Sequence, residues 1–274
     1  MKNTKKMTAD DINKLSYTDF IGLVNQWNVL PGSYNTLNKW RVFSNMTNNS
    51  RILEIACTTG FSCRELAILT GCSGVGIDIS EPSIKMAEYN KSLYAPNINM
   101  KYIAIDGYKY EASEKFSHII FGAALRFFPD PQAMLKKSLT MLEDNGYILS
   151  SEFYINQAIP QKFVTEAREV FGINITQVPY KEVMKIYEGL EIFYEDKNEL
   201  IQETEEEINY YTKSTIDRAV NMLNISNKDI YDAMYQRLFT IKNMSNKLRP
   251  YQRHNVLVLR YRSNIYPKRY TELF

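Results

Sequence analysis

The chain has 274 residues, of which 45% are hydrophobic and 23% are charged, and its formal net charge is +2. This is the composition of one large globular domain, or of one domain with a cap. A near-neutral charge gives no global sign of a polyanionic partner. No apolar run reaches the roughly 20 residues of a membrane-spanning helix, and the basic start MKNTKKMTADD lacks the apolar segment of a signal peptide.

The first 49 residues are predicted to be helical and irregular, with a turn at Pro31-Gly32. From Arg51 onward, short apolar strands alternate with helices. Helices are expected over 61–70, after Ser80 as N-cap, and from Pro131. The strands of this part are predicted over 51–56, 74–80, 100–106, 116–123 and 147–153.

After Phe153 the rhythm changes. Helical segments are expected over about 161–189, followed by a sixth strand over 190–201. Thr204 and Glu207 have the spacing of a capping box, which opens a helix to about Leu223, and another helix is expected over 228–247. The alternating run from Asn255 predicts a seventh strand. These elements predict an α/β, doubly wound, Rossmann-like domain with a mostly parallel seven-stranded sheet.

Three cysteines, Cys57, Cys63 and Cys72, lie in one short region. Their odd number and their spacing match neither a disulfide framework nor paired CxxC metal ligands. We therefore expect a reducing, cytoplasmic setting and no metal site.

Acidic and small residues stand where the predicted parallel strands end, which is where ligands bind in such sheets. Glu54 ends the first strand, and the loop after it ends in Gly60. Asp78 ends the second strand, where a carboxylate can accept hydrogen bonds from ribose hydroxyls. Asp106-Gly107 follows the third strand, and the small residues Gly122-Ala123 follow the fourth. Together they predict a nucleotide-like ligand.

Four segments carry a resemblance to a known family. LEIACTTG resembles a glycine-rich first motif, GIDIS a second-strand acid motif, and AIDG an adenine-contacting motif. FSHIIFGAALRFFPDPQAMLKKSLTMLEDNGYILSSEF resembles the block that leads into the fifth strand. The chain is similar here to class I S-adenosylmethionine-dependent methyltransferases, most closely to the small-molecule branch that includes ubiquinone-biosynthesis-like enzymes. The resemblance covers about residues 50–153 and implies that the last strand runs antiparallel.

The resemblance implies S-adenosylmethionine as cofactor and assigns its contacts. Glu54, Ala56 and Gly60 would line the methionine end, with the Thr58 hydroxyl available beside them. Asp78 would hold the ribose, and Ile79 would pack on the adenine. The remaining contacts would come from Asp106 and Gly107 at the adenine edge and from the backbone of Gly122 and Ala123 at the methionine ammonium.

The chain departs from the family pattern at several positions. Ala56 and Thr58 stand where glycines are usual, and Arg126-Phe127 stands where paired histidines are common. Glu152, at the end of the fifth strand, and His254, before the last strand, are the candidate general bases. The early strand position of His118 indicates a structural role.

The acceptor pocket is expected under a roof of helices. Residues 1–49 would form an N-terminal lid, 50–153 the cofactor core and 154–254 an acceptor-side region with a helical insertion over 203–248, while 255–274 would hold the last strand and tail. Side chains expected to line the pocket are Trp27, Tyr34, Arg126, Tyr154 and Tyr210. The expected partner is a small-molecule acceptor, with no membrane contact, for a monomer or a homodimer.

Three other readings stay open. A nicotinamide dehydrogenase would need G-x-G-x-x-G, whereas this loop has E-x-A-x-T-x-G. A nucleic-acid methyltransferase could use Arg249, Arg253 and the basic segment RYRSNIYPKRY, although the strand-four signature of base-amino methylases is missing. The third alternative is a non-enzymatic protein that keeps the cofactor-binding fold.

Overall fold

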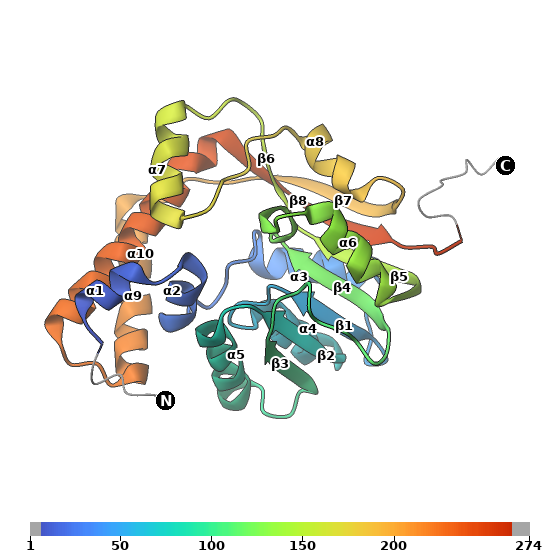
Figure 1. The fold of residues 1–274 in the computed structure, drawn as a ribbon, viewed down its shortest axis with the longest axis horizontal. Coiled ribbons are helices and arrows are strands. Elements are labelled where there is room, and N and C mark those ends of the chain that lie inside the picture. The colour runs from blue at the N-terminus through green and yellow to red at the C-terminus, as the bar shows by residue number, and fades with distance from the viewer. Residues whose placement is uncertain (1–6, 265–274) are drawn as a thin grey trace.

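The structure is a computed structural model that describes residues 7–264. An eight-stranded sheet forms its centre (Figure 1). The strands are β1 (Arg51–Ile55), β2 (Ser73–Asp78), β3 (Met100–Ala104), β4 (Phe116–Gly122), β5 (Leu142–Ser150), β6 (Phe153–Ile155), β7 (Glu191–Glu199) and β8 (Gln252–Arg260). The first five lie in the order β3-β2-β1-β4-β5, all parallel, and β8 follows antiparallel to β5. The antiparallel last strand is thus confirmed.

The outer end of the sheet is built around β8. β7 pairs along almost the whole of one edge of β8, from Arg253 to Arg260. β5 pairs with Leu257–Arg260 and β6 with Gln252–His254, so these two strands share the other edge end to end. The three-residue β6 was not predicted from the sequence, because it only extends the line of β5 after a break.

Helices cover both faces of the sheet and one of its ends. They are α1 (Ala9–Lys14), α2 (Tyr17–Leu23), α3 (Ser33–Phe43), α4 (Phe61–Thr70), α5 (Glu81–Tyr94), α6 (Pro131–Thr140), α7 (Gln161–Phe171), α8 (Tyr180–Met184), α9 (Glu205–Leu223) and α10 (Lys228–Leu248). Short 3₁₀ turns add η2 (Leu125–Phe127), η3 (Lys185–Tyr187) and η4 (Arg249–Tyr251). The segment expected to be helical over 161–189 therefore forms two helices and a 3₁₀ turn.

Local stop and start signals place the helix ends where the sequence predicts them. α4 begins after Gly60 and ends at Gly71, both in the left-handed conformation. The Ser80 hydroxyl caps α5 by accepting from the Ser83 backbone N–H. Thr204 and Glu207 form the predicted capping box of α9. Because each signal acts within a few residues of the helix end, the sequence alone was enough to predict these ends.

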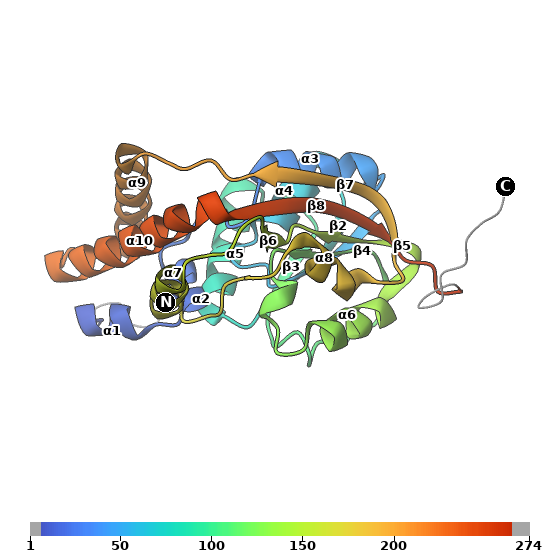
Figure 2. The same ribbon diagram turned by 90° about the horizontal axis from the view of Figure 1, so that it is seen from above.

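Three apolar clusters hold the layers together. One, with Leu53, Ile119 and Leu135, joins one face of the sheet to α6 and η3. Another, with Ile52, Trp40 and Leu66, joins the opposite face to α3, α4 and α5. The third fills the interior of a helical bundle made by α1, α2, α7, α9 and α10. Figure 2 shows α3 and α4 on one side of the sheet and α6 and α8 on the other.

The helical bundle lies at the end of the sheet where the parallel strands finish. β8 begins directly after α10 and η4, and it runs antiparallel to β5. The start of β8 and the carboxyl ends of the parallel strands therefore point toward the bundle, as Figures 1 and 2 show. Ligands of such sheets bind at this end. Among the described residues no helix has both the length and the apolar character to cross a membrane.

α2 packs tightly onto the first turn of α5, next to the end of β2. A side chain at Gly22 would place its Cβ 2.4 Å from the Ser83 backbone nitrogen, so only glycine allows this approach. Ser80 Oγ donates to Asp19 Oδ1 at 2.7 Å, and Ser83 Oγ donates to the Thr18 carbonyl at 3.1 Å. The N-terminal helices are thus anchored beside the site that Asp78 marks.

Candidate active site

The loop after β1 has a backbone that normally requires glycine. Ala56 has φ 62°, Thr58 has φ 48° and Gly60 has φ 75°, so all three occupy the left-handed region. Gly60 also has no room for a side chain, since an added Cβ would lie 2.7 Å from the Tyr102 ring. The loop therefore has the backbone conformation that favours glycine at two positions where this chain has Ala56 and Thr58.

Glu54 supports this loop from inside. Its carboxylate is buried and accepts a hydrogen bond from the Cys63 backbone N–H in the first turn of α4, at 3.0 Å. Burial raises the pKa of Glu54 to about 7, because the charged form loses its hydration. The side chain fixes the start of the helix relative to β1.

Asp78 ties the end of β2 to the same loop. Its Oδ2 accepts from the Thr58 N–H at 2.9 Å, and its Oδ1 accepts from the Ser80 N–H at 2.8 Å. Burial raises the pKa of this carboxyl, while the two N–H donors oppose the shift. Each carboxylate oxygen keeps a lone pair for a further donor. Ile79, the next residue, is 70% exposed, which suits an apolar platform for a ligand.

The ends of β3 and β4 supply the next contacts. Asp106 is half-buried and accepts from the Tyr108 N–H at 3.0 Å, and Gly107 is buried. Gly122 has φ 57°, and its carbonyl accepts from the Ser151 N–H at 2.6 Å and from Ser150 Oγ at 3.2 Å. The half-buried Ala123 follows it. Gly122 thus joins the ends of β4 and β5.

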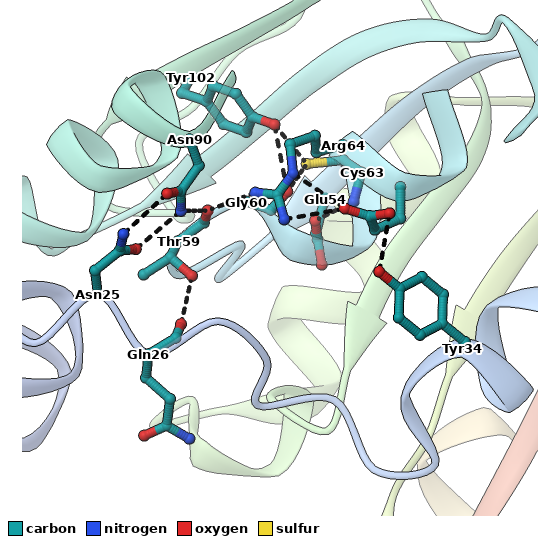
Figure 3. Close-up of polar contacts among 11 residues, drawn as sticks. Asn25, Gln26, Tyr34, Glu54, Thr59, Gly60, Cys63, Arg64, Asn90 and Tyr102 are labelled. Atoms are coloured by element: carbon teal, nitrogen blue, oxygen red, sulfur yellow. Dashed lines mark hydrogen bonds and ion pairs between the residues drawn. The ribbon is translucent and has the colours of Figure 1, made fainter. Parts of the chain in front are cut away.

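The N-terminal segment contacts the loop after β1 through a chain of polar contacts (Figure 3). Thr59 Oγ1 donates to the Gln26 carbonyl at 2.7 Å. Asn25 and Asn90 exchange two side-chain hydrogen bonds of 2.9 Å, and Asn90 also donates to the Thr59 carbonyl at 3.2 Å. Arg218 of α9 donates to the Asn25 carbonyl at 2.8 Å. This network joins the N-terminal segment, α9, α5 and the loop after β1.

Glu152 stands just beyond the end of β5 in a buried cluster of hydroxyl groups. Its Oε1 accepts from Tyr187 Oη at 2.9 Å and lies 3.2 Å from Ser150 Oγ. Those two hydroxyls lie 2.7 Å apart. Burial raises the pKa of Glu152 to about 7, and the positive charge of Arg126 opposes the shift. A carboxyl with this pKa suits proton transfer near neutral pH.

His254 lies on the opposite face of the sheet from Glu152. Its Nδ1 is 3.3 Å from Ser151 Oγ, and its neighbours on the same face of β8, Val256 and Val258, belong to the cluster under α3. Burial lowers the pKa of His254. The two predicted bases therefore do not face one site, and Glu152 has the better position. His118 is buried, with its ring nitrogens near Ser117 Oγ and the Ser44 carbonyl.

The aromatic residues predicted to line the acceptor pocket lie on several different elements. Trp27 packs between α4 and α5, with the Arg64 guanidinium over its ring at 4.2 Å. Tyr34 Oη donates to Glu65 on α4 at 3.1 Å. Tyr154 packs on Tyr180, and Tyr210 on α9 is 75% exposed.

The basic residues considered for nucleic-acid binding are paired with acids. Arg249 forms an ion pair of 2.7 Å with Glu203, and Arg253 one of 3.0 Å with Glu199. Most of the segment RYRSNIYPKRY lies beyond residue 264, outside the described residues. No group of three or more metal-ligating acids, histidines and cysteines occurs between residues 7 and 264.

Tyr187, Ser150 and Asn90 are site residues that the sequence did not reveal. Tyr187 reaches Glu152 across 35 positions, and Asn90 reaches Asn25 across 65. No spacing rule links Tyr187 or Asn90 to partners so far away in the sequence, so only the folded chain brings them together.

The chain matches the model of a family described as "Methyltransferase domain" over residues 46–237. A ubiquinone biosynthesis O-methyltransferase from Chromobacterium violaceum is 23% identical over 101 residues, which are 37% of this chain and 43% of that enzyme. The chain thus matches less than half of the length of this relative.

Two solved structures have similar folds. The MccD protein has a TM-score of 0.69 and 24% identity, covering 86% of this chain and 100% of that one. A SAM-dependent methyltransferase from Geobacter sulfurreducens, solved with S-adenosyl-L-homocysteine, has a TM-score of 0.66 and 14% identity, covering 88% and 96%. Because the family model spans well over half of the chain and the fold agrees, this protein belongs to the methyltransferase-domain family.

Proposed function

We propose that the protein transfers a methyl group from S-adenosylmethionine to a small-molecule acceptor. The observation that carries this proposal is the position of Asp78, whose carboxylate ends β2 and is fixed by the Thr58 N–H of the loop after β1. The geometry supports a nucleoside whose ribose hydroxyls donate to Asp78. Family membership supports the reaction class, and the relative from Chromobacterium violaceum is named as an O-methyltransferase.

The residues at the strand ends fit this cofactor. An added Cβ at Gly122 would meet only the Leu30 side chain, at 3.6 Å, so the backbone of this strand end is open to close approach. The exposed face of Ile79 offers an apolar surface for an adenine ring. We propose that Glu54, Ala56, Thr58 and Gly60 surround the methionine end and that Asp106 and Gly107 contact the adenine edge.

When bound, S-adenosylmethionine supplies an activated methyl group: the acceptor's lone pair forms the new bond to carbon, and the electrons of the carbon–sulfur bond remain on sulfur. The protein must align the acceptor, exclude water and remove a proton where the acceptor has one. Glu152 is proposed to take that proton on its carboxylate, with Tyr187 and Ser150 holding Oε1. The N-terminal lid would exclude water.

Calorimetric titration with S-adenosylmethionine tests the cofactor assignment. Asp78→Ala should weaken binding by about 10- to 100-fold, because hydrogen bonds to a charged group are lost. Asp232→Ala, which removes an exposed acid on α10, is the matched control and should bind like the wild type. Ile79→Ser should weaken binding several-fold without affecting folding, since this side chain is exposed. Unchanged affinity in both site variants would refute the assignment.

A second experiment tests the reaction. The protein is incubated with a cell extract and methyl-labelled S-adenosylmethionine, and metabolites and RNA are analysed by mass spectrometry. We expect the label in one small molecule. Label in RNA would overturn the small-molecule class, and binding of NADH in place of S-adenosylmethionine would overturn the reaction itself.

A further inference from the structure

The surroundings of Glu152 contain two donors that no described residue satisfies. Arg126 lies on η2, directly after the end of β4, and is half-buried. Its guanidinium forms no hydrogen bond and no ion pair with any residue between 7 and 264. Because Arg126 is half-buried, its guanidinium remains accessible to a ligand.

Arg126 lies four residues after Gly122, whose carbonyl is bonded to the Ser151 N–H and lies 3.2 Å from Ser150 Oγ, next to Glu152 in the chain. Its positive charge lowers the pKa of both Glu152 and Tyr187, in opposition to burial. Oε1 of Glu152 is taken by Tyr187 and Ser150. Oε2 accepts no hydrogen bond from a described residue, and it is not among the fully buried unpartnered atoms. The carboxylate therefore has one constrained oxygen and one that a ligand could meet.

Asn255 contributes the second donor. Its Oδ1 accepts from the Glu152 N–H at 2.7 Å, which fixes the orientation of the amide. The Nδ2 group is consequently a donor, and it is buried without a partner. Buried donors without acceptors are rare in folded proteins, and a bound water, ion or ligand is one explanation for them. Asn255 thus places an unpartnered donor next to the backbone of Glu152.

We propose that the methyl acceptor carries an acidic group, a carboxylate or a phosphate, which pairs with Arg126, while Asn255 Nδ2 donates to an oxygen of the same molecule. This inference rests on the proposed function. A guanidinium presents several donors in a plane and pairs well with either acid. The same anion would neutralise the charge of Arg126. The pKa of Glu152 would then rise, and its carboxylate would be a stronger base when the acceptor is in place.

The experiment begins with a cell extract split by an anion-exchange resin at neutral pH. Each fraction is incubated with the wild-type protein and methyl-labelled S-adenosylmethionine. The labelled product should arise from the retained, anionic fraction. Product only from the unretained fraction would overturn the anionic acceptor while leaving methyl transfer intact. No product from either fraction, with S-adenosylmethionine bound, would refute the proposed function and this inference with it. Phosphatase treatment then separates the two acids, because only a phosphate-bearing acceptor is lost.

Variants assign the recognition to Arg126. With the retained fraction as acceptor source, Arg126→Met should raise the apparent KM by about 10- to 100-fold and leave the affinity for S-adenosylmethionine unchanged. Arg126→Lys should recover part of the loss, since it keeps the charge but not the planar fork. Lys136→Met, an exposed cation on α6, is the matched control and should keep the wild-type KM. An Arg126→Met variant with the wild-type KM would overturn the proposal.

Discussion

The left-handed loop after β1 offers the sharpest test of the structure. Ala56 at φ 62° and Thr58 at φ 48° hold a conformation that glycine adopts freely. A left-handed backbone costs an L-residue roughly 1–2 kcal/mol, and glycine loses roughly 0.5–1 kcal/mol more chain entropy on folding. Ala56→Gly and Thr58→Gly should therefore each raise the free energy of unfolding by about 0.5–1 kcal/mol.

Urea unfolding followed by circular dichroism measures this gain. The midpoint should rise while the m-value stays constant, and the melting temperature should rise by about 1–3 °C per substitution. Thr58→Gly should gain the more, because its branched side chain tolerates the left-handed region less well than Ala56. The Thr58 N–H that binds Asp78 is kept in the variant.

Two controls bracket the experiment. Asn145 also has a positive φ, 61°, but asparagine tolerates it, so Asn145→Gly should change stability little. Gly60→Ala should destabilise the protein, because the added Cβ would lie 2.7 Å from the Tyr102 ring. If Thr58→Gly and Ala56→Gly both lower the midpoint, the loop does not hold the left-handed backbone and the reasoning fails.

Two further predictions concern the base and the lid. In the wild type, kcat/KM should rise with pH through about 7 as Glu152 ionises. Glu152→Gln should abolish this pH dependence and lower kcat/KM about 10²–10⁴-fold. An unchanged pH profile in the variant would exclude Glu152 as the base. Because burial raises the pKa of Glu152 and Glu54 to about 7, their contribution to stability is lost as pH rises from about 4.5 to about 7, and urea midpoints should fall over that window. Asn90→Ala should destabilise the protein by about 2–3 kcal/mol, since it leaves Asn25 and the Thr59 carbonyl without their partners. It should also weaken S-adenosylmethionine binding in calorimetry. Asn97→Ala, at an exposed position, is the control, and equal stability and affinity of the two variants would refute the coupling of lid and loop.

The sequence by itself determined the order of the elements and the strand ends that carry acids. Gly60, Gly71, Ser80 and the Thr204–Glu207 box act within one helical turn, so their effect is readable without the fold. Apolar runs and alternation likewise predicted the seven main strands, because burial of one or both sheet faces imposes them. The acids Asp78 and Asp106 followed from the same elements.

Only the tertiary structure decided which distant side chains meet. Glu152 and His254 were both candidate bases along the chain, but the fold places them on opposite faces of the sheet. Tyr187 reaches Glu152 from a 3₁₀ turn that no periodicity marks. The partners of the aromatic residues expected near the acceptor, such as Glu65 for Tyr34 and Tyr180 for Tyr154, also became known only from the fold. Contacts between residues far apart in sequence depend on the packing of whole layers, which local patterns do not specify.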